Sequence, residues 1–417
     1  MKIAYPVCPD QQKVPSDRPS DSQDAPAATP EALPDTRQAG LKPWRVVLVG
    51  IGGYGQNYVE AALDREKQGI IHLAGIVDPI ASLSGQFAKV AHLPCYPNLE
   101  SFYRLHQADL AIISSPIHYH ASQVCTALAH GSHVLCEKPL CATADEARAM
   151  RLAYHASGKI AAIGFQWSFS APVLQARQEI LNGRWGAFRQ LRCMVNWPRP
   201  FAYYQRNNWA GRVQTDQGET VLDSILNNAT AHYLHQILFF LGGSLTAAAR
   251  PDALQAACYR AYPIETYDTA FVRMMFGTVP AFIAVSHATR RRLDPQFEFI
   301  LDEGTFFCTG DDRLQLRMRD GQVLDYGSMS VGTVEGKLDT VIRAMGTGET
   351  IPCDVDTASA HAAVIQMIHQ IPVHSFAADA IETLNAGDSR EERLVVNGLE
   401  KMMDACYASL ELPPLTL

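Results

Sequence analysis

A glycine-rich turn directly after an apolar run carries the strongest chemical signal in this sequence of 417 residues. Residues 46–49 read Val-Val-Leu-Val, which is typical of a strand buried on both faces. The G-x-G-x-x-G pattern that follows consists of Gly50, Ile51, Gly52, Gly53, Tyr54 and Gly55. The first glycine of such a pattern permits a tight turn, the second lets the backbone approach a pyrophosphate, and the third lets a helix pack closely. Because the start of that helix also favours phosphate, we predict that this turn binds a dinucleotide.

Asp78 indicates which dinucleotide to expect. It ends a second apolar run, residues 73–77, roughly 20 residues beyond the glycines, where a dinucleotide fold holds the adenosine ribose. A carboxylate there accepts hydrogen bonds from the ribose hydroxyls and repels a 2′-phosphate, so NAD is favoured and NADP is less favoured. The alternative is a tight turn with a solvated aspartate at a strand end, and the complete order of strand, glycines, helix, strand and acid argues against it.

The end of a third apolar run places Ser115, Pro116 and His120 where a cofactor would lie. These residues follow the strand that we predict over residues 110–114. Ligands of open α/β sheets bind outside the carboxyl ends of the strands. Pro116 lacks an N–H group and has a fixed φ, so it turns the chain sharply beside the cofactor. We expect all three residues to contribute to the cofactor site.

Lys138 follows the next apolar run, residues 133–136, and would face the same crevice beside Glu137. Burial by an apolar nicotinamide pocket lowers the pKa of a lysine, whereas a neighbouring glutamate raises it. Lys138 is therefore a candidate general acid/base, or a donor to the reacting oxygen of a substrate. The alternative is an exposed lysine in a Glu-Lys-Pro turn, which is the more common case when such a turn stands alone.

A polar stripe interrupts an otherwise apolar segment at Asn228, His232 and His235. If residues 222–241 form one helix, these three side chains lie at i, i+4 and i+7 on one face and converge on a cavity or on each other. The alternative is a pair of buried histidines satisfied by their neighbours. A metal site is disfavoured, because the stripe carries no acidic or sulfur ligand.

Aromatic residues suggest where a carbohydrate ring could bind. Residues 196–209 are dense in aromatic and polar side chains and end at Trp209, and Gln166 and Trp167 occupy the predicted crossover between domains. Flat aromatic faces beside amide and guanidinium donors suit sugar rings. An equally good interpretation of residues 196–209 is a proline-rich connection between elements.

The elements that must position these residues alternate between strand and helix in the first part of the chain. The predicted strands are residues 46–49, 73–77, 110–114, 133–136 and 160–164. The predicted helices are residues 56–67, 80–91, 120–130 and 143–157. Such alternation indicates βαβ units and a doubly wound parallel sheet. We therefore predict an α/β fold with a dinucleotide-binding domain over residues 44–165.

The second part of the chain has a different texture, from which we predict an α/β domain over residues 166–417. Its predicted helices are residues 170–183, 222–241, 359–370 and 391–410. Its predicted strands are residues 188–197, 270–276, 281–287 and 297–301. Short strands joined by tight turns indicate a mostly antiparallel sheet.

Composition restricts the possible partners and compartment. A net charge of −8 argues against nucleic acid or an anionic membrane surface. Ten cysteines without C-x-x-C pairs suggest reduced thiols and a cytoplasmic protein. No apolar run approaches the ~20 residues that span a bilayer. Residues 1–43 are rich in Pro, Asp, Ser, Gln and Ala without the apolar core of a secretory signal, so we expect a disordered tail.

Taken together, these motifs resemble the glucose–fructose oxidoreductase / inositol dehydrogenase / MocA (GFO/IDH/MocA) family. The most specific match is residues 127–140, Ala-Leu-Ala-His-Gly-Ser-His-Val-Leu-Cys-Glu-Lys-Pro-Leu. The resemblance covers residues 44–169 well and the later domain by its general plan. It implies a Rossmann domain, a second domain with an open and largely antiparallel sheet used for oligomer contacts, and hydride transfer between nicotinamide and a carbinol carbon. It also implies that Lys138 orients the substrate and assists proton transfer.

The sequence departs from the family pattern around His232. The resemblance implies that this histidine forms a proton-transfer dyad with an aspartate four residues earlier, where this chain has Asn228. An amide cannot stabilise imidazolium as a carboxylate does, so His232 should be a weaker base. Three possibilities follow: a carboxylate from the preceding loop supplies the charge, His235 relays the proton, or Lys138 carries acid/base duty alone while His232 and Asn228 bind the substrate. The loop carboxylates are Asp216, Glu219 and Asp223.

These observations predict an NAD-dependent oxidoreductase that oxidises a secondary alcohol of a sugar, sugar derivative or cyclitol. We expect a homo-oligomer, a dimer or tetramer, with no nucleic-acid or membrane partner and no metal. The alternatives are an enzyme that recycles tightly bound NAD during glycoside cleavage or epimerisation, and a non-catalytic sensor or scaffold that binds dinucleotide.

Overall fold

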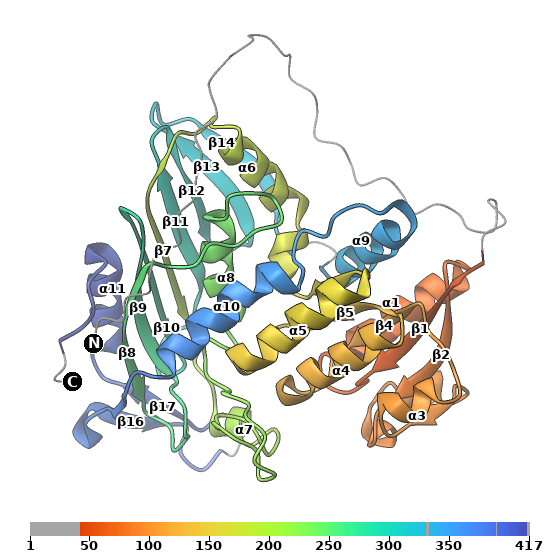
Figure 1. The fold of residues 1–417 in the computed structure, drawn as a ribbon. Coiled ribbons are helices and arrows are strands. Elements are labelled where there is room, and N and C mark those ends of the chain that lie inside the picture. The colour runs from red at the N-terminus through yellow and green to blue at the C-terminus, as the bar shows by residue number, and fades with distance from the viewer. Residues whose placement is uncertain (1–41, 331–332, 389, 415–417) are drawn as a thin grey trace, which may run out of the picture.

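The computed structural model describes residues 42–330, 333–388 and 390–414, so the tail expected over residues 1–43 lies almost wholly outside the described residues. Within these ranges the chain forms two large sheets side by side and a small two-stranded one (Figure 1). This arrangement confirms the predicted fold class: a parallel sheet built by the first part of the chain and a mostly antiparallel one built by the second.

The first sheet has the strand order β3-β2-β1-β4-β5-β6, and every pairing is parallel. Its strands are β1 (Trp44–Val49), β2 (Ile71–Val77), β3 (Cys95–Tyr96), β4 (Leu110–Ile113), β5 (His133–Cys136) and β6 (Ala161–Ile163). The longer helices between them are α1 (Gly55–Lys67), α4 (Ile117–Ala129) and α5 (Ala144–Ser157), and a short helix α3 (Leu99–Tyr103) precedes β4. Because the strand order reverses between β1 and β4, their carboxyl ends frame the crevice in which such sheets bind ligands.

The helix predicted over residues 80–91 is wrong. The chain forms only a 3-10 turn η1 (Ala81–Leu83) and one helical turn α2 (Phe87–Val90). Between them the Ser84 hydroxyl donates to the carbonyl of Ile51 at 2.7 Å and accepts from the Gln86 N–H at 3.2 Å. A serine side chain that hydrogen-bonds to nearby backbone groups competes with the i to i+4 backbone hydrogen bonds of a helix. A continuous helix therefore does not form across Ser84.

The second sheet runs in the order β14-β13-β12-β11-β7-β10-β9-β8-β15. Its strands are β7 (Phe188–Asn196), β8 (Ala253–Arg260), β9 (Thr269–Phe276), β10 (Val279–Ser286), β11 (Leu293–Leu301), β12 (Gly304–Thr309), β13 (Arg313–Met318), β14 (Val323–Ser328) and β15 (Val373–Ser375). Within the described residues, only the β7–β10 and β8–β15 pairings are parallel. The sheet is therefore mostly antiparallel, as predicted, although the sequence did not reveal β8, β12, β13, β14 or β15.

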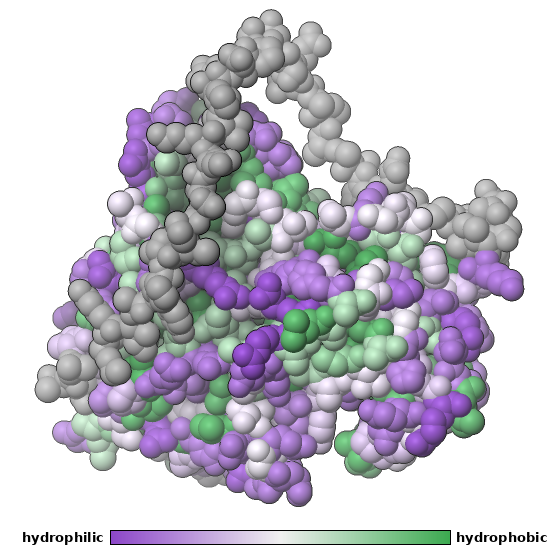
Figure 2. Space-filling view, viewed as in Figure 1, coloured by the Kyte–Doolittle hydropathy of each residue, from purple (hydrophilic) through white to green (hydrophobic). Residues whose placement is uncertain are grey.

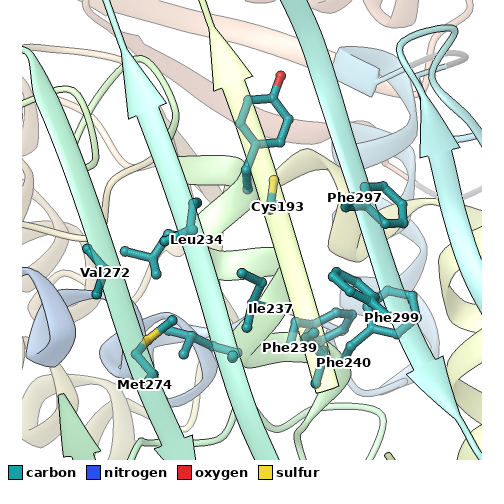
Figure 3. Packing of buried hydrophobic residues seen from close by; sticks show 14 of the residues in the cluster. Cys193, Leu234, Ile237, Phe239, Phe240, Val272, Met274, Phe297 and Phe299 are labelled. Carbon is teal, nitrogen blue, oxygen red and sulfur yellow. The ribbon is translucent and has the colours of Figure 1, made fainter. Parts of the chain in front are cut away.

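Helices cover the inner face of the second sheet. The chain crosses between the sheets through η2 (Gln166–Phe169), and α6 (Ala171–Leu181) and α8 (Ala231–Phe240) follow. Figure 3 shows Leu234, Ile237 and Phe240 of α8 packed against Cys193 of β7 and Phe299 of β11, all of them buried. Because α8 is fixed by this core, the residues at its N-terminal end are held in place toward the first sheet.

Two helices from late in the sequence return to the parallel sheet. In α9 (Thr333–Thr347), Leu338 and Val341 pack in the apolar cluster on the α1 side of that sheet. In α10 (Val355–Ile368), Ala358 packs in the cluster on the α5 side. Figure 1 shows α9 beside β5 and α1, and α10 lying between α5 and the second sheet. Residues from both parts of the chain therefore build the walls between the two sheets.

Two more predicted helices begin later than expected. Residues 222–230 form turns and α8 begins at Ala231, because Asn227 and Thr230 donate their side-chain hydrogen bonds to the carbonyls of Leu222 and Ile225. In the range 391–410, which was predicted as one helix, the first residues form a strand. That strand, β17 (Arg393–Val396), pairs with β16 (Ile381–Leu384), and α11 (Leu399–Ser409) follows Gly398. The short helices α7 (Phe201–Tyr204) and η3 (Ala378–Ala380) complete the described elements.

The surface is mixed in character. Figure 2 shows hydrophilic side chains interspersed with smaller hydrophobic areas across the face it draws. Across the described ranges of the chain, no helix is both long and apolar enough to cross a membrane. Most of the large apolar side chains lie in the clusters on the two faces of each sheet, and a few, such as Leu83 and Leu105, are exposed.

Candidate active site

The three motif glycines of the glycine turn, Gly50, Gly52 and Gly55, have different surroundings. Gly50 adopts a φ of +77°, and a Cβ there would lie 2.9 Å from the backbone nitrogen of Ser115. A Cβ on Gly55 would lie 2.3 Å from the carbonyl oxygen of Gly50, so only glycine lets α1 start this close to β1. A Cβ on Gly52 would meet no protein atom within 4 Å. The first and third glycines are thus needed by the fold, and the second borders open space.

Asp78 lies beside this turn at the carboxyl end of β2. Its carboxylate accepts the N–H of Ile51 at 3.0 Å through Oδ2 and the N–H of Ile80 at 3.0 Å through Oδ1. The acid therefore belongs to the same site as the glycines, at the position predicted for the ribose. The next side chains along the chain, Ile80 and Leu83, are exposed and border the same end of β2 with apolar surface.

His120 connects the two loops that follow β4 and β5. It is 1% exposed, and its ring nitrogens lie 2.8 Å from the Pro139 carbonyl and 2.9 Å from the Ser115 carbonyl. Burial lowers the pKa of His120. Pro116 starts α4, and the Ser115 hydroxyl donates to Gln123 at 2.5 Å. His120 thus connects the loop after β4 with the loop after β5, and its ring is buried between them.

Glu137 is buried in an ion pair. Its Oε1 accepts hydrogen bonds from the Tyr58 hydroxyl at 2.7 Å and from the Nζ of Lys337. Burial by itself raises the pKa of Glu137, but the Lys337 charge and these two hydrogen bonds outweigh it, so the pKa lies below its usual value. A Cβ on Gly164 would lie 2.8 Å from this carboxylate, which shows how tightly the group is enclosed.

Lys337 is a site residue that the sequence analysis missed. It is 0% exposed and lies on α9, some 200 residues beyond Glu137. Its Nζ is 5.3 Å from the ring centroids of both Tyr54 and Tyr58. The sequence does contain a pattern that indicates burial of this lysine. Lys337 lies on the apolar face of an amphipathic segment, at helical spacing with Val334, Leu338 and Val341.

Lys138 joins the loop after β5 to the segment before α8. Its Nζ donates to the Asn228 carbonyl at 2.8 Å and lies 3.4 Å from the Asn228 Oδ1. Burial lowers the pKa of Lys138 to about 8, although the adjacent Glu137 raises it. A lysine with this pKa exchanges its proton near neutral pH, as a general base must.

Asp223 brings a buried carboxylate into the same network. Its Oδ1 accepts from the Asn228 Nδ2 at 2.7 Å, and its Oδ2 accepts from the Gly211 N–H at 2.7 Å and lies 3.4 Å from an Arg206 nitrogen. Burial raises the pKa of Asp223, and the Arg206 charge partly offsets that effect. Lys138, Asn228 and Asp223 therefore form one continuous chain of hydrogen bonds.

The other two loop carboxylates take different partners. Asp216 is exposed and pairs with Arg212. Glu219 lies 3.9 Å from the Nε2 of His118 and accepts from the Thr215 hydroxyl at 2.7 Å. Among the three carboxylates considered from the sequence, Asp223 is the one that contacts Asn228.

His232 occupies the first turn of α8 and is half-buried. Burial, together with the positive charge of Lys138, lowers its pKa well below the usual value, so the ring is neutral near pH 7. The Nδ1 of His232 is buried and has no hydrogen-bond partner among the described residues. A neutral imidazole can donate or accept one hydrogen bond to a substrate hydroxyl through its more exposed side.

His235 lies in the core. It is 1% exposed, its ring stacks on Phe165 at 3.9 Å between centroids, and its Nε2 lies 3.1 Å from the Ser168 hydroxyl. Phe165 also meets His232 edge-on at 5.9 Å. Because residues 222–230 are not helical, Asn228 does not share a helical stripe with the two histidines, which corrects the predicted arrangement.

The two tryptophans predicted to contact substrate, Trp167 and Trp209, have different environments. Trp167 is 3% exposed and packs on Tyr233 and Phe297 in the core of the second sheet, which contradicts its predicted place in the cleft. Trp209 meets His118 edge-on at 6.3 Å.

Gln166 borders a hollow of about 430 Å³ at the glycine turn. Tyr54, Asn57, Glu60, Val334 and Glu335 line the rest of it. Gln166 thus lies on the cofactor side of the crossover. In the described part of the chain, no group of three or more His, Cys, Asp or Glu side chains is placed to hold a metal ion.

A parallel sheet with a glycine turn after β1, an acid after β2 and a lysine after β5 is typical of a dinucleotide-binding oxidoreductase. Residues 44–165 match the family model described as an oxidoreductase family with an NAD-binding Rossmann fold, and residues 173–307 match the GFO/IDH/MocA C-terminal domain. The chain belongs to the GFO/IDH/MocA family, as the sequence predicted. Its cofactor class, NAD, is that of the family.

Curated relatives include several dehydrogenases. The chain is 30% identical over 159 residues to the rhizopine catabolism protein MocA of Rhizobium meliloti, covering 36% of this chain and 46% of MocA. It is 25% identical over 288 residues to the D-apiose dehydrogenase of Paraburkholderia graminis, covering 67% and 72% respectively. The alignment to MocA spans less than half of that protein, so these activities are not carried over directly.

Solved structures share the fold. The WlbA dehydrogenase of Bordetella pertussis, solved with NADH and UDP-GlcNAcA, has a TM-score of 0.65 and 19% identity over 79% of this chain and 96% of that one. A levoglucosan dehydrogenase solved with NADH and levoglucosan has a TM-score of 0.64 and 18% identity over the same shares. At these identities the likeness supports the two-domain fold.

Proposed function

We propose that this protein is an NAD-dependent dehydrogenase that oxidises a secondary alcohol of a sugar, sugar derivative or cyclitol. The observation that carries this proposal is Lys138, whose pKa of about 8 and position after the carboxyl end of β5, in contact with Asn228, suit a base for an alcohol proton. Family membership supplies the NAD-binding half of the argument. When bound, NAD accepts the hydride from the carbinol carbon.

The protein's own side chains then have distinct roles. Lys138 takes the hydroxyl proton, and Asn228 holds the lysine amine in place through its carbonyl at 2.8 Å. Asp223 fixes the Asn228 amide and contributes negative charge near the lysine. His232 is neutral and orients the substrate hydroxyl. His235 has a packing role against Phe165 in place of the proton relay considered from the sequence.

Cofactor contacts follow the sequence predictions in this proposal. The turn from Gly50 to Gly55 holds the pyrophosphate, and Asp78 binds the ribose. Ser115, Pro116 and Glu137 shape the nicotinamide end, with His120 supporting them from the core. Gln166 and Trp209 border the substrate in this proposal. Trp167 does not contact it, because its side chain is buried.

The first experiment follows nicotinamide and its reduction. Purified protein is examined for co-purifying nicotinamide by absorbance and mass, and a panel of sugars and cyclitols is then added with NAD while NADH absorbance at 340 nm is recorded. We expect NADH with one class of polyol, and Lys138→Ala should abolish it while NAD affinity stays within about twofold. Near-normal turnover by Lys138→Ala would overturn the role of Lys138.

Other outcomes of this experiment select the alternatives. Tightly held NAD without net reduction favours a recycling enzyme, and product analysis then distinguishes glycoside cleavage from epimerisation. Dinucleotide binding without any turnover favours a sensor, for which the only support is the replacement of the family aspartate by Asn228. The buried Asp223 weakens that support, since it returns a carboxylate to the network.

We also propose a cytoplasmic homo-oligomer. The nine cysteines within the described residues are all free, which suits a reducing compartment. Oligomer contacts are proposed for the second sheet by analogy with the family plan.

A further inference from the structure

Lys337 forms a charged connection between the last third of the chain and the candidate active site. The side chain is 0% exposed, which is rare for lysine because burying a charge is costly unless it is paired. Its single ion pair among the described residues is with Glu137, the residue directly before Lys138. The Tyr58 hydroxyl bonds to the same carboxylate oxygen at 2.7 Å. The positive charge of Lys337 therefore lies close to the candidate base, Lys138.

The surroundings of Lys337 join three elements of the site. Tyr54 belongs to the glycine turn, Tyr58 lies on α1, and Glu137 follows β5. The Nζ of Lys337 is 5.3 Å from the centroids of both tyrosine rings, close enough for a cation–π contribution. The Glu137 Oε2 also lies 3.2 Å from the backbone nitrogen of Lys138. A movement of α9 would therefore act on both the cofactor turn and the base.

We propose that Lys337 is a positioning residue: its ion pair with Glu137 fixes the Glu137–Lys138 turn, so that α9 must be docked for the site to be complete. This inference rests on the proposed role of Lys138. Lys337 itself has no exposed surface through which a substrate could contact it. Its effect passes through Glu137 to the orientation and charge of the lysine amine.

A purely structural pair is the competing explanation, and the charges around Lys138 distinguish the two. Those that act on its amine are Glu137, Asp223, Lys337 and Arg206, and His232 lies near it on α8. Glu137 raises the pKa of Lys138, whereas Lys337 lowers it. A positioning pair must change the behaviour of Lys138 when it is altered, but a pair that only stabilises the core changes the unfolding temperature alone.

The experiment measures the Lys138 amine directly, without a substrate. The full-length protein is pulsed with acetic anhydride between pH 6 and 11, and mass spectrometry gives the acetylated fraction of the Lys138 peptide at each pH. Lys67, whose side chain is 77% exposed, is the internal reference. The variants are Lys337→Met, Lys337→Arg, Glu137→Gln and the double variant Lys337→Met/Glu137→Gln.

Opposite shifts are expected from the two partners. Lys337→Met should move the Lys138 midpoint upward by about one pH unit, because a nearby positive charge is lost, and Lys337→Arg should restore it. Glu137→Gln should move the midpoint downward. The double variant removes both buried charges, so it should fold even if a single variant does not, and its midpoint should lie below that of the wild type.

A Lys138 midpoint that stays within 0.3 pH units of the wild type in all folded variants would overturn the proposal and leave a core ion pair. This result differs from a failure of the proposed function. Normal turnover by Lys138→Ala would remove the catalytic role of Lys138, yet the acetylation midpoints would still report whether Lys337 acts on its amine.

Discussion

At the scale of single residues, the protonation of Lys138 decides when the proposed reaction can run. A base for an alcohol proton must itself be deprotonated, and burial brings the pKa of this lysine down to about 8. We therefore expect kcat/KM for alcohol oxidation to rise with pH and level off above an apparent pKa of about 8. Initial rates in a constant-ionic-strength buffer series between pH 6 and 10 measure this.

The reverse reaction provides the control for that pH profile. Reduction of the corresponding ketone needs the protonated amine, so its rate should fall as pH rises through the same value. An oxidation rate that is already level across this pH range, with its rise below pH 6.5, would point instead to a histidine as the base, because burial lowers the pKa of His232.

Asn228 leads to a second residue-level prediction. The family pattern suggests that Asn228→Asp restores a missing dyad, but the structure places this side chain 2.7 Å from Asp223. An aspartate at position 228 cannot donate the hydrogen bond to Asp223, and it adds negative charge beside the Lys138 amine. We expect Asn228→Asp to lower turnover at pH 7, roughly tenfold, by raising the pKa of Lys138.

Asn228→Asp/Asp223→Asn is the matched control for this substitution, because it exchanges the amide and the carboxylate without adding charge. It should recover part of the lost turnover. An increase in activity from Asn228→Asp alone would show that the carboxylate belongs at position 228 and that Asp223 does not replace it.

At the scale of elements, different glycines of the turn are expected to serve the fold and the cofactor: Gly55 lets α1 pack against β1, and Gly52 borders the proposed pyrophosphate site. A Cβ at position 55 would lie 2.3 Å from the Gly50 carbonyl, whereas one at position 52 meets no protein atom within 4 Å. Gly55→Ala should therefore destabilise the protein by about 1–3 kcal/mol. Gly52→Ala should leave the melting temperature of the free protein unchanged and weaken NAD binding about tenfold or more.

Thermal denaturation and NAD titration of the two variants, side by side, test this division. Unchanged NAD affinity in Gly52→Ala would mean that the cofactor does not pass over this turn. A normal melting temperature for Gly55→Ala would mean that α1 can move away from β1 at little cost.

At the scale of the whole molecule, ligand binding should stabilise the folded protein according to cofactor affinity. A ligand at 100 times its Kd adds about 2.7 kcal/mol. Because Asp78 disfavours a 2′-phosphate, NAD should raise the melting temperature more than NADP at equal concentration. Asp78→Asn, which keeps an acceptor for the Ile51 N–H, should reduce that difference. Equal shifts with the wild type would contradict the role of Asp78.

Assembly is also a property of the whole molecule. We expect size-exclusion chromatography with light scattering to give two or four times the monomer mass. A monomer at micromolar concentration would show that the second sheet does not serve oligomer contacts here, without affecting the proposed chemistry.

The sequence by itself determined the local features. The glycine turn, Asp78, the parallel sheet and the Glu137–Lys138 pair were all predicted, because each depends on residues close together in the chain and on the direct periodicity of buried strands. The non-helical conformation of residues 222–230 was not predicted, because side-chain hydrogen bonds from Asn227 and Thr230 compete with helical ones and the apolar pattern does not report that competition.

Only the tertiary structure decided which distant residues complete the site. Asp223 was one of three equal candidates until folding placed it against Asn228, and Lys337 lay in a segment with no recognised motif. Trp167 has the same side chain whether it lines a cleft or fills a core, and the packing of Tyr233 and Phe297 settled that choice. Long-range contacts of this kind depend on how two sheets meet, which no short stretch of sequence encodes.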